Sequence, residues 1–232
     1  MIPPIPANES SRLEALRRYR ILDTAAEEAY DDITQIVATV TGCPTAMVTL
    51  VDENRQWFKS KIGMTDSETP REVSFCAHAI LHEEVMVVPD ATRDARFCDN
   101  RLVTSGPLIR FYAGAPLINV DGYALGTLCV IDQKPHEMDA VQKRTLSALA
   151  RQVSLLFEMR LNSIRLAEAL EAVKTLKELL PMCAYCRRVR DDDGYWEAVE
   201  DYVANHSGSS FSHGICMDCA DKYFPRRRTT TV

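Results

Sequence analysis

The chain has 232 residues, and its 27 Lys and Arg against 33 Asp and Glu give a net charge of −6. This acidic balance argues against a protein whose main partner is a nucleic acid. With 46% hydrophobic and 26% charged residues, the composition is typical of a folded chain, and no apolar run reaches the roughly eighteen residues of a membrane span.

The N-terminal segment and the cysteines indicate the cellular compartment. Residues 1–8 lack the basic start and apolar core of a signal peptide, so we expect a cytoplasmic protein. Without a secretion signal, the eight cysteines are better explained by metal or redox chemistry than by a disulfide scaffold. Four of them are isolated in the first 138 residues, and four form two close pairs near the C-terminus.

Two capping-box patterns predict the first helices. Ser11 with Glu14, and Thr24 with Glu27, each place a carboxylate three residues after a hydroxyl side chain, which is typical of a helix start. The second helix carries apolar residues at helical spacing. Residues 42–44, Gly-Cys-Pro, are expected to end it.

The following segment reads mainly as short strands bounded by turns. The predicted elements are strands at 46–51, 56–62 and 85–88, a short helix at 75–82, and strands at 110–120 and 123–131. The last two are joined at Asp121-Gly122, a strong hairpin signal. Helices at both ends of an antiparallel sheet predict an α+β domain over residues 1–138, with its core from about residue 10.

Three sequence stretches in this domain form a specific pattern. They are Asp-Asp-Ile-Thr at 31–34, Leu-Val-Asp-Glu-Asn-Arg-Gln-Trp-Phe-Lys-Ser at 50–60, and Gly-Tyr-Ala-Leu-Gly-Thr-Leu-Cys-Val-Ile-Asp at 122–132. Together they resemble the GAF family of small-molecule sensor domains. Residues 69–80 are similar to its bacterial signalling branch, which sits beside kinase and cyclase domains. The resemblance implies a six-stranded antiparallel sheet flanked by helices.

The same resemblance implies a ligand pocket between one face of the sheet and the loops of residues 64–112. Aromatic walls with a few arginines would suit a planar or anionic ligand. The candidate ligand-binding residues are Phe58, Phe75, Cys76, His78, Arg93, Arg96, Phe97, Asp99, Asn100, Arg110 and Tyr112. The alternative is that Arg96, Asp90 and Asp99 only fix the loop through ion pairs and turn hydrogen bonds.

Thiol chemistry is the competing interpretation of this domain. Cys76 and Cys98 lie near positions that free methionine sulfoxide reductases of the GAF type use, so a thiol reductase is an alternative to a sensor. Asp99 beside Cys98 would raise that thiol's pKa and slow its attack. Cys76 and His78 are also typical of buried core residues. A third possibility is a domain without a ligand that serves as a dimerisation scaffold.

Residues 139–180 contain neither Pro nor Gly and are rich in helix formers. One helix ending at Pro181 would be on the order of 60 Å long, which is more than one small domain can bury. We expect its second half to pair with the same helix of a second subunit, giving a homodimer; the alternative is a helix folded back on the C-terminal segment. The predicted apolar seam comprises Leu146, Leu149, Val153, Leu156, Met159, Leu166, Leu170, Val173, Leu176 and Leu180.

The two close cysteine pairs predict a metal site in residues 181–232. Cys183 and Cys186, and Cys216 and Cys219, are each Cys-x-x-Cys, and 29 residues separate the pairs. Four thiolates at tetrahedral corners are the ligands of a structural zinc ion, which would also explain how so small a module folds. Such a closed site leaves no position for metal catalysis. Iron in a rubredoxin-like site is the lesser alternative.

This module resembles a C-terminal segment that follows sensor or receiver domains in bacterial signalling proteins, and the resemblance implies no activity. The sequence as a whole therefore predicts a bacterial signal-transduction protein. A GAF-like sensor binds an unidentified small molecule, and a dimerising helix couples it to a zinc module. No kinase, cyclase or phosphodiesterase motif is present, so we expect the catalytic output to lie in a partner such as a kinase or cyclase.

Overall fold

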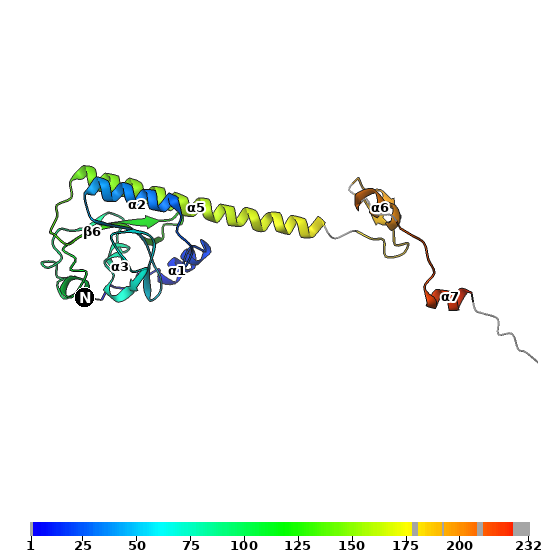
Figure 1. Cartoon of the computed structure of the whole chain (residues 1–232), viewed down its shortest axis with the longest axis horizontal. Coiled ribbons are helices and arrows are strands. Elements are labelled where there is room, and N and C mark those ends of the chain that lie inside the picture. Colours follow the sequence, from blue (N-terminus) through cyan, green and yellow to red (C-terminus); the bar gives the residue numbers. More distant parts are fainter. Residues whose placement is uncertain (1, 178–180, 192, 208–210, 225–232) are drawn as a thin grey trace, which may run out of the picture. The chain divides into compact units, whose positions relative to one another are not determined.

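The computed structural model describes residues 2–177, 181–191, 193–207 and 211–224 of the chain (Figure 1). The chain divides into two units, Met1–Ala167 and Glu168–Val232. Within the described residues, no helix is both long and apolar enough to cross a membrane.

The first unit is built on a six-stranded antiparallel sheet in the order β3-β2-β1-β6-β5-β4. The strands are β1 (Thr45–Val51), β2 (Arg55–Ile62), β3 (Glu68–Pro70), β4 (Met86–Val88), β5 (Phe111–Ile118) and β6 (Ala124–Asp132). The predicted hairpin is confirmed: β5 pairs with β6, and Gly122 adopts a φ of 83° in the turn, a left-handed conformation that favours glycine.

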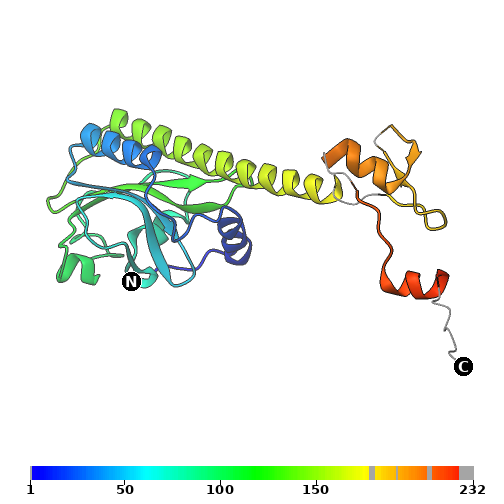
Figure 2. The same ribbon diagram turned by 45° about the vertical axis from the view of Figure 1, so that its right-hand side comes forward.

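Helices α2 (Glu28–Thr41) and α5 (Ala140–Lys177) lie side by side along one face of the sheet in both ribbon views (Figures 1 and 2). The rings of Tyr30 on α2 and Phe157 on α5 are 5.9 Å apart. Both belong to one hydrophobic core that includes inward residues of β1, β5 and β6. The sheet flanked by helices confirms the predicted fold class.

The opposite face of the sheet is covered by a mostly irregular segment. Apart from the short edge strands β3 and β4, residues 63–110 form a 3₁₀ turn at Arg71–Val73 and the short helices α3 (Phe75–Ala79) and α4 (Arg101–Thr104). Side chains of this segment form a second hydrophobic core with Met47 of β1, Tyr112 of β5 and Cys129 of β6. The central strands are thus buried on both faces.

The predicted helix starts were wrong, whereas one predicted helix end was right. Helix α1 (Glu9–Arg18) begins before Ser11, and α2 begins four residues after Thr24, with no side-chain cap at Glu27. Thr24 instead donates to the carbonyl of Ile21 and accepts from Lys59. Gly42 ends α2 as expected, with a φ of 70°.

Helix α5 is continuous over 38 residues, which corresponds to about 57 Å at ~1.5 Å per residue. Of the predicted apolar seam, Leu146 and Val153 are fully buried, whereas Met159 and Leu166 are exposed. The side chains of Val173, Leu176 and Leu180 lie outside those that the structure describes.

Beyond the end of α5, the described residues of the second unit form a small hairpin and two short helices. Strands β7 (Val189–Arg190) and β8 (Trp196–Glu197) are antiparallel, and helices α6 (Val199–Ser207) and α7 (Met217–Tyr223) follow. Val189 is fully buried, but many large apolar side chains are exposed, among them Tyr185, Tyr195, Ile215 and Phe224. Such sparse burial would leave so short a segment with little hydrophobic stabilisation.

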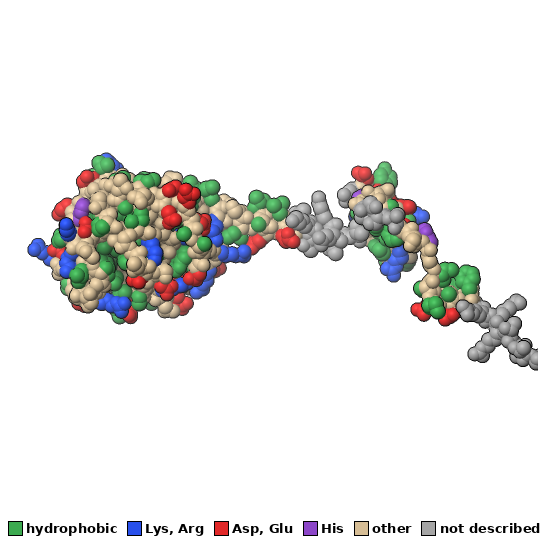
Figure 3. Space-filling view, in the orientation of Figure 1, with side chains coloured by type: hydrophobic (Ala, Val, Ile, Leu, Met, Phe, Trp, Pro, Cys, Tyr) green, Lys and Arg blue, Asp and Glu red, His purple; other side chains and the backbone are tan. Residues whose placement is uncertain are grey.

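Charged side chains do not gather into one basic patch on the face of the first unit seen in Figure 3, where acidic and basic groups are interspersed. One ion-pair cluster near α1 is shielded from water. Arg12, with an exposed fraction of 1%, donates to both oxygens of Glu9. Arg71 also donates to Glu9 and to the carbonyl of Asp52. This cluster fastens α1 to the irregular segment that covers the second face.

We predict that Glu9→Gln lowers the free energy of unfolding by about 2 to 3 kcal/mol at neutral pH, because Arg12 loses its buried counter-charge. Burial acts to raise the pKa of Glu9, but hydrogen bonds from Arg12 and Arg71 outweigh it and lower the pKa from 4.5 to about 2. This stabilisation is therefore complete above pH 4.5 and is lost as the pH falls towards 2.

Urea unfolding of the wild type and of Glu9→Gln between pH 2 and pH 7 measures the difference in their free energies of unfolding. The matched control is Glu53→Gln, since Glu53 is 64% exposed and 3.6 Å from Arg17, and we expect a change below about 0.5 kcal/mol for it. A Glu9→Gln effect that stays constant from pH 7 down to pH 2 would contradict the ion-pair explanation.

Candidate functional site

A cavity of about 470 Å³ lies between the second face of the sheet and the irregular segment. Apolar side chains from three strands form its walls, including Met47 of β1, Phe58 of β2 and Tyr112 of β5. Cys76 of α3 also faces it. The exposed residues Asp66, Glu68, Pro70, Arg101 and Gly106 stand at its rim, so the cavity opens to solvent. Its size is in the range of small-molecule sites.

Helix α3 is held against the cavity by its N-cap, Ser74, the residue that precedes it. The hydroxyl of Ser74 accepts a hydrogen bond from the amide of Ala77 and so caps the helix. It also donates to the side-chain oxygen of Gln56 on β2, which lines the cavity. These two bonds fix where Phe75 and Cys76 point.

Aromatic rings form the layer beneath this helix. Phe75 stacks on Phe97 with ring centroids 4.0 Å apart, and it lies 5.2 Å from Tyr112. His78 meets the edge of Phe97 at 4.8 Å. Phe97 is fully buried and is not among the side chains that line the cavity, so it supports the cavity wall from beneath.

Four of the eleven predicted ligand-binding residues line this cavity: Phe58, Phe75, Cys76 and Tyr112. His78 and Phe97 belong to the packing beneath. Asn100 caps α4 by accepting from Leu102 and donates to the carbonyl of Val73.

The predicted arginines and acids of this region mostly bind neighbouring loop residues. Arg96 pairs with Asp94 at 2.7 Å and lies over the Phe97 ring. Arg93 pairs with Asp90 at 3.5 Å, and Arg110 donates to two main-chain carbonyls, those of Val103 and Ile109. Asp99 lies in an exposed part of the same loop. Arg96 and Asp90 thus make the kind of contacts expected if they fix the loop, the alternative to ligand binding.

Sequence reasoning missed most of the cavity lining. The missed residues are Met47, Gln56, Met64, Thr65, Asp66, Glu68, Thr69, Pro70, Arg101, Leu102, Gly106, Pro107, Ile109 and Ile131. The alternation of strand side chains between the two faces of the sheet could have identified Met47 and Ile131, because every second residue of β1 and β6 points to the face that carries the cavity. The loop residues carried no such signal.

A second hollow, about 770 Å³ in volume, lies along β2 and the segment before α2. It opens widely to solvent, and the charged residues Asp31, Asp32 and Lys61 are among its lining residues. Its buried end is closed by Lys59, which donates to the hydroxyl of Thr24 and pairs with Glu27 at 2.6 Å. We regard the smaller cavity as the ligand site because apolar side chains enclose it more fully.

The two cysteines of the thiol-reductase alternative differ in environment. Cys76 is buried and Cys98 is exposed. The sulfur atom of Cys76 lies 3.7 Å from that of Cys129 on β6, a residue that the sequence did not single out.

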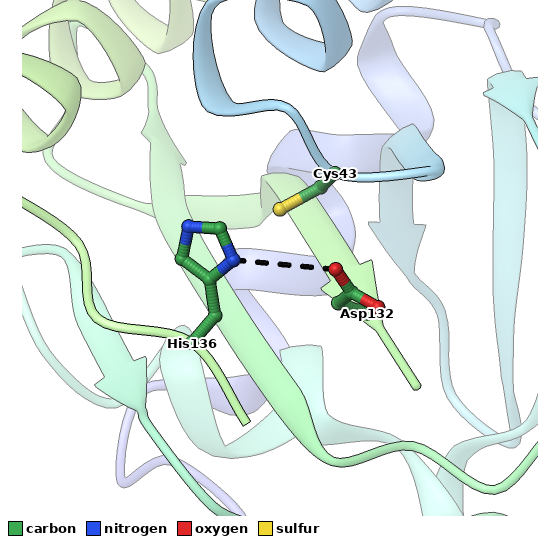
Figure 4. Close-up of side chains that lie close together, drawn as sticks. All are labelled: Cys43, Asp132 and His136. Carbon is green, nitrogen blue, oxygen red and sulfur yellow. Dashed lines mark ion pairs between the residues drawn. The ribbon is translucent and has the colours of Figure 1, made fainter. Parts of the chain in front are cut away.

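Cys43, Asp132 and His136 come together where α2 and β6 end (Figure 4). Their potential ligand atoms all lie within 4.8 Å of one another, and the Nδ1 of His136 is 4.0 Å from a carboxylate oxygen of Asp132. Burial and the neighbouring Asp132 raise the pKa of Cys43, despite a hydrogen bond with Thr41. This is the one group of three such ligands within 4.8 Å in the part of the chain that the structure describes.

Each C-terminal cysteine pair is held by its own local turn. The amide of Cys183 donates to the carbonyl of Arg188, and Arg187 adopts a φ of 61°. Main-chain amides of Cys186, Tyr185 and Arg187 point at the Cys183 sulfur and lower its pKa.

Cys216 is the N-cap of α7, and the amides of Cys219 and Asp218 lower its pKa in the same way. Donors aimed at sulfur favour the thiolate form that a metal requires. Both pairs are thus chemically suited to bind metal. The four sulfur atoms do not form one group within ligand distance among the described residues.

Comparison with known proteins identifies the first unit. The model of the GAF domain family matches residues 25–157, which is more than half of the chain. The chain belongs to the GAF domain family. It is 44% identical over 133 residues to the cyclic di-GMP phosphodiesterase PA2567 of Pseudomonas aeruginosa, a match that covers 57% of this chain and 23% of that protein.

Solved GAF-like structures are more distant in sequence. A domain of a putative two-component sensor histidine kinase from Sinorhizobium meliloti is 19% identical, with 62% of this chain and 99% of that chain covered and a TM-score of 0.49. The GAF domain of an Acinetobacter phosphoenolpyruvate-protein phosphotransferase is 17% identical. The match covers 66% of this chain and 95% of that chain, with a TM-score of 0.49.

Proposed function

We propose that this GAF domain senses a small molecule in a bacterial signalling protein of the cytoplasm. The observation that supports this most strongly is the solvent-accessible cavity of about 470 Å³ on the second face of the sheet. Enclosed apolar walls with a few polar groups at the rim are typical of sites that bind small molecules.

The lining defines the class of ligand. Phe58, Phe75 and Tyr112 offer aromatic surface at the inner end, and the amide of Gln56 is one of the polar groups there. Arg101 at the rim supplies a cation, and Asp66 supplies an anion. The carboxylate of Glu68, also at the rim, is paired with Arg55 at 2.6 Å. A planar or apolar body with a polar end fits this arrangement, whereas a ligand with several phosphates would meet the carboxylate of Asp66.

Strand β6 offers a direct route from the cavity to the long helix. Ile131, near the end of β6, lines the cavity, and α5 begins at Ala140, eight residues after Asp132. A ligand that favours one position of β6 would therefore bias the packing of α5 on the same sheet. This geometry supports α5 as the output element of the sensor.

The outer face of α5 supports a homodimer. Leu155, Met159 and Leu166 are 53% to 62% exposed and lie at the four- and seven-residue spacing of a coiled-coil seam. Val153 and Phe157, on the other side of the helix, are buried in the GAF core. We propose that the exposed stripe pairs with the same stripe of a second copy.

The output itself would lie in a partner protein. The relative PA2567, whose name describes a cyclic di-GMP phosphodiesterase, is much longer than the region of similarity. Because the 44% identity extends over 133 residues, only 23% of that relative, we propose that the present chain shares the regulatory part, and that a kinase, cyclase or similar signalling enzyme responds to it.

We propose a structural zinc ion in the second unit, held by Cys183, Cys186, Cys216 and Cys219. The amide donors around Cys183 and Cys216 support thiolates at both pairs. Zinc would join the two turns and supply the stabilisation that the exposed apolar residues of this unit do not.

We predict that filling the cavity removes ligand binding. Met64→Trp adds a large ring at a half-buried position of the lining, whereas Val120→Trp adds the same ring at a site that is 79% exposed. The probe is 8-anilinonaphthalene-1-sulfonate, an apolar aromatic anion. Its fluorescence titration should show one site per chain, weakened at least about tenfold by Met64→Trp alone.

Native mass spectrometry of the purified full chain complements this titration by detecting a ligand retained from the cell. Equal binding of the probe to both tryptophan variants would contradict the assigned site. A chain that binds neither probe nor retained ligand would favour the dimerisation scaffold.

We predict about one zinc per chain by elemental analysis of the purified protein, as expected for four thiolate ligands. The double variant Cys183→Ser, Cys216→Ser should lose it. The control is Cys43→Ser, which disrupts the only other group of ligands found among the described residues and should leave the zinc content unchanged. Zinc lost in the control but kept in the double variant would contradict the assignment.

We predict that Met159→Glu with Leu166→Glu weakens dimerisation at least about 100-fold, because two apolar contacts are replaced by charges that repel across the seam. Ala167→Glu is the control, since it adds one such charge at an exposed position of α5 outside the stripe. Sedimentation equilibrium measures the dimer dissociation constant of the wild type, the double variant and the control. A wild-type chain that is monomeric at micromolar concentration would contradict the proposed dimer.

A further inference from the structure

Two thiols meet in the buried wall of the cavity. The sulfur of Cys76 on α3 lies 3.7 Å from that of Cys129 on β6. The hydroxyl of Tyr112 donates a hydrogen bond of 3.3 Å to Cys76. Cys76 and Cys129 are 2% and 0% exposed, yet Cys76 also faces the cavity that opens to solvent.

The surrounding fold fixes this arrangement. Cys129 lies between Met47 of β1 and Gly114 of β5 in the sheet. A side chain at position 114 would collide with the hydroxyl of Tyr112, so glycine leaves the space in which that hydroxyl reaches Cys76. The Ser74 cap holds α3 above the sheet. The two thiols therefore come from two independently anchored elements.

The sulfur separation is short enough for a disulfide to form by small movements. A disulfide bond is about 2.05 Å long, so the sulfur atoms must approach by about 1.7 Å. Rotation of the two side chains can supply much of this, because α3 and β6 already pack in the same core. The helix α3 is only five residues long and is free of the sheet's hydrogen-bond ladder, so it can adjust to the remainder.

The two thiols differ in how readily they ionise. Burial acts to raise the pKa of Cys76, but the hydrogen bond from Cys129 and those from three neighbouring hydroxyl groups outweigh it and lower this pKa to about 7. The same pairing raises the pKa of Cys129 well above its ordinary value. Cys76 is thus the group suited to attack, and Cys129 the group suited to resolve the product.

We propose that Cys76 and Cys129 form a redox site that reacts with hydrogen peroxide or a small organic hydroperoxide entering through the cavity. Cys76 ionises and its thiolate attacks one peroxide oxygen. The O–O bond breaks, the departing oxygen takes up the proton that Cys76 released and leaves as an alcohol or water, and a sulfenic acid remains on Cys76. The Cys129 thiol then attacks that sulfur, and the S–O bond breaks with release of water. Two thiols thus lose two electrons, the peroxide gains them, and a Cys76–Cys129 disulfide remains.

This site shares the cavity with the proposed ligand, but its chemistry differs from ligand sensing and from the thiol-reductase alternative. The pair consists of Cys76 with Cys129 on β6, so it needs no contribution from the exposed Cys98. A disulfide here would tie α3 to the strand that leads to α5, and it would alter the cavity wall at Cys76. Oxidation would therefore act on the elements that also surround the cavity.

The test is peptide mapping of the reduced, full-length chain after treatment with one to five equivalents of hydrogen peroxide. Free thiols are alkylated under denaturing conditions, and the digest is read by mass spectrometry. We expect linked peptides containing Cys76 and Cys129, with a mass two hydrogens below the sum of the reduced peptides. The exposed Cys98 in the same molecule is the internal reference and should oxidise at least tenfold more slowly.

Variants separate the two steps. Cys129→Ser should stop at a sulfenic acid on Cys76 that dimedone traps, whereas Cys76→Ser should leave Cys129 reduced. Cys43→Ser is the control, because it removes another buried thiol and should form the linkage as the wild type does. Tyr112→Phe, which keeps the ring and removes the hydrogen bond, should slow the reaction at least fivefold.

Recovery of Cys76 and Cys129 fully alkylated in the wild type, while Cys98 or the C-terminal pairs are oxidised, would overturn the proposal. The wild-type map decides this even if a cysteine variant fails to fold. A linkage from Cys76 to Cys98 in place of Cys129 would also overturn it.

Discussion

The burial of the central strands on both faces is the constraint on which the rest of this structure depends. Strands β1, β5 and β6 are buried along nearly their whole length, so each face needs its own cover. Helices α2 and α5 cover one face with continuous apolar stripes. The other face is covered by residues 63–110, whose helices are short and which otherwise form loops and the two short edge strands β3 and β4. An irregular cover packs less completely than a helix, and it encloses the cavity that we assign to a ligand.

The same arrangement concentrates function on one strand. Strand β6 supplies Ile131 to the cavity, Cys129 to the thiol pair and Asp132 to the group with Cys43 and His136. It pairs with both β1 and β5 and leads into α5. Ligand binding, thiol oxidation and the position of α5 would therefore all involve one element, which is the physical basis for coupling them.

The sequence was enough to predict the main regular elements of this fold, but it predicted only some of the residues that line the cavity. The Asp121-Gly122 hairpin and the long helix followed from turn chemistry and composition. The capping boxes failed, because Thr24 is used to anchor the buried Lys59 and Asn8 precedes α1. Phe58 and Tyr112 were identified as cavity residues, but Met64 and Arg101 were not, because loop conformation has no periodicity. The contact of Cys129 with Cys76 joins residues 53 positions apart, which spacing alone cannot reveal.

Native-state hydrogen exchange of the full chain tests most directly whether the second face is covered by a separately opening segment. We expect amides of β1, β5 and β6 to exchange only through global unfolding, and those of residues 63–110 to exchange through local opening of lower free energy. Added 8-anilinonaphthalene-1-sulfonate should slow exchange in that segment and leave α2 unchanged. Exchange of residues 63–110 at the global free energy, with no effect of the probe, would contradict this account of the cavity.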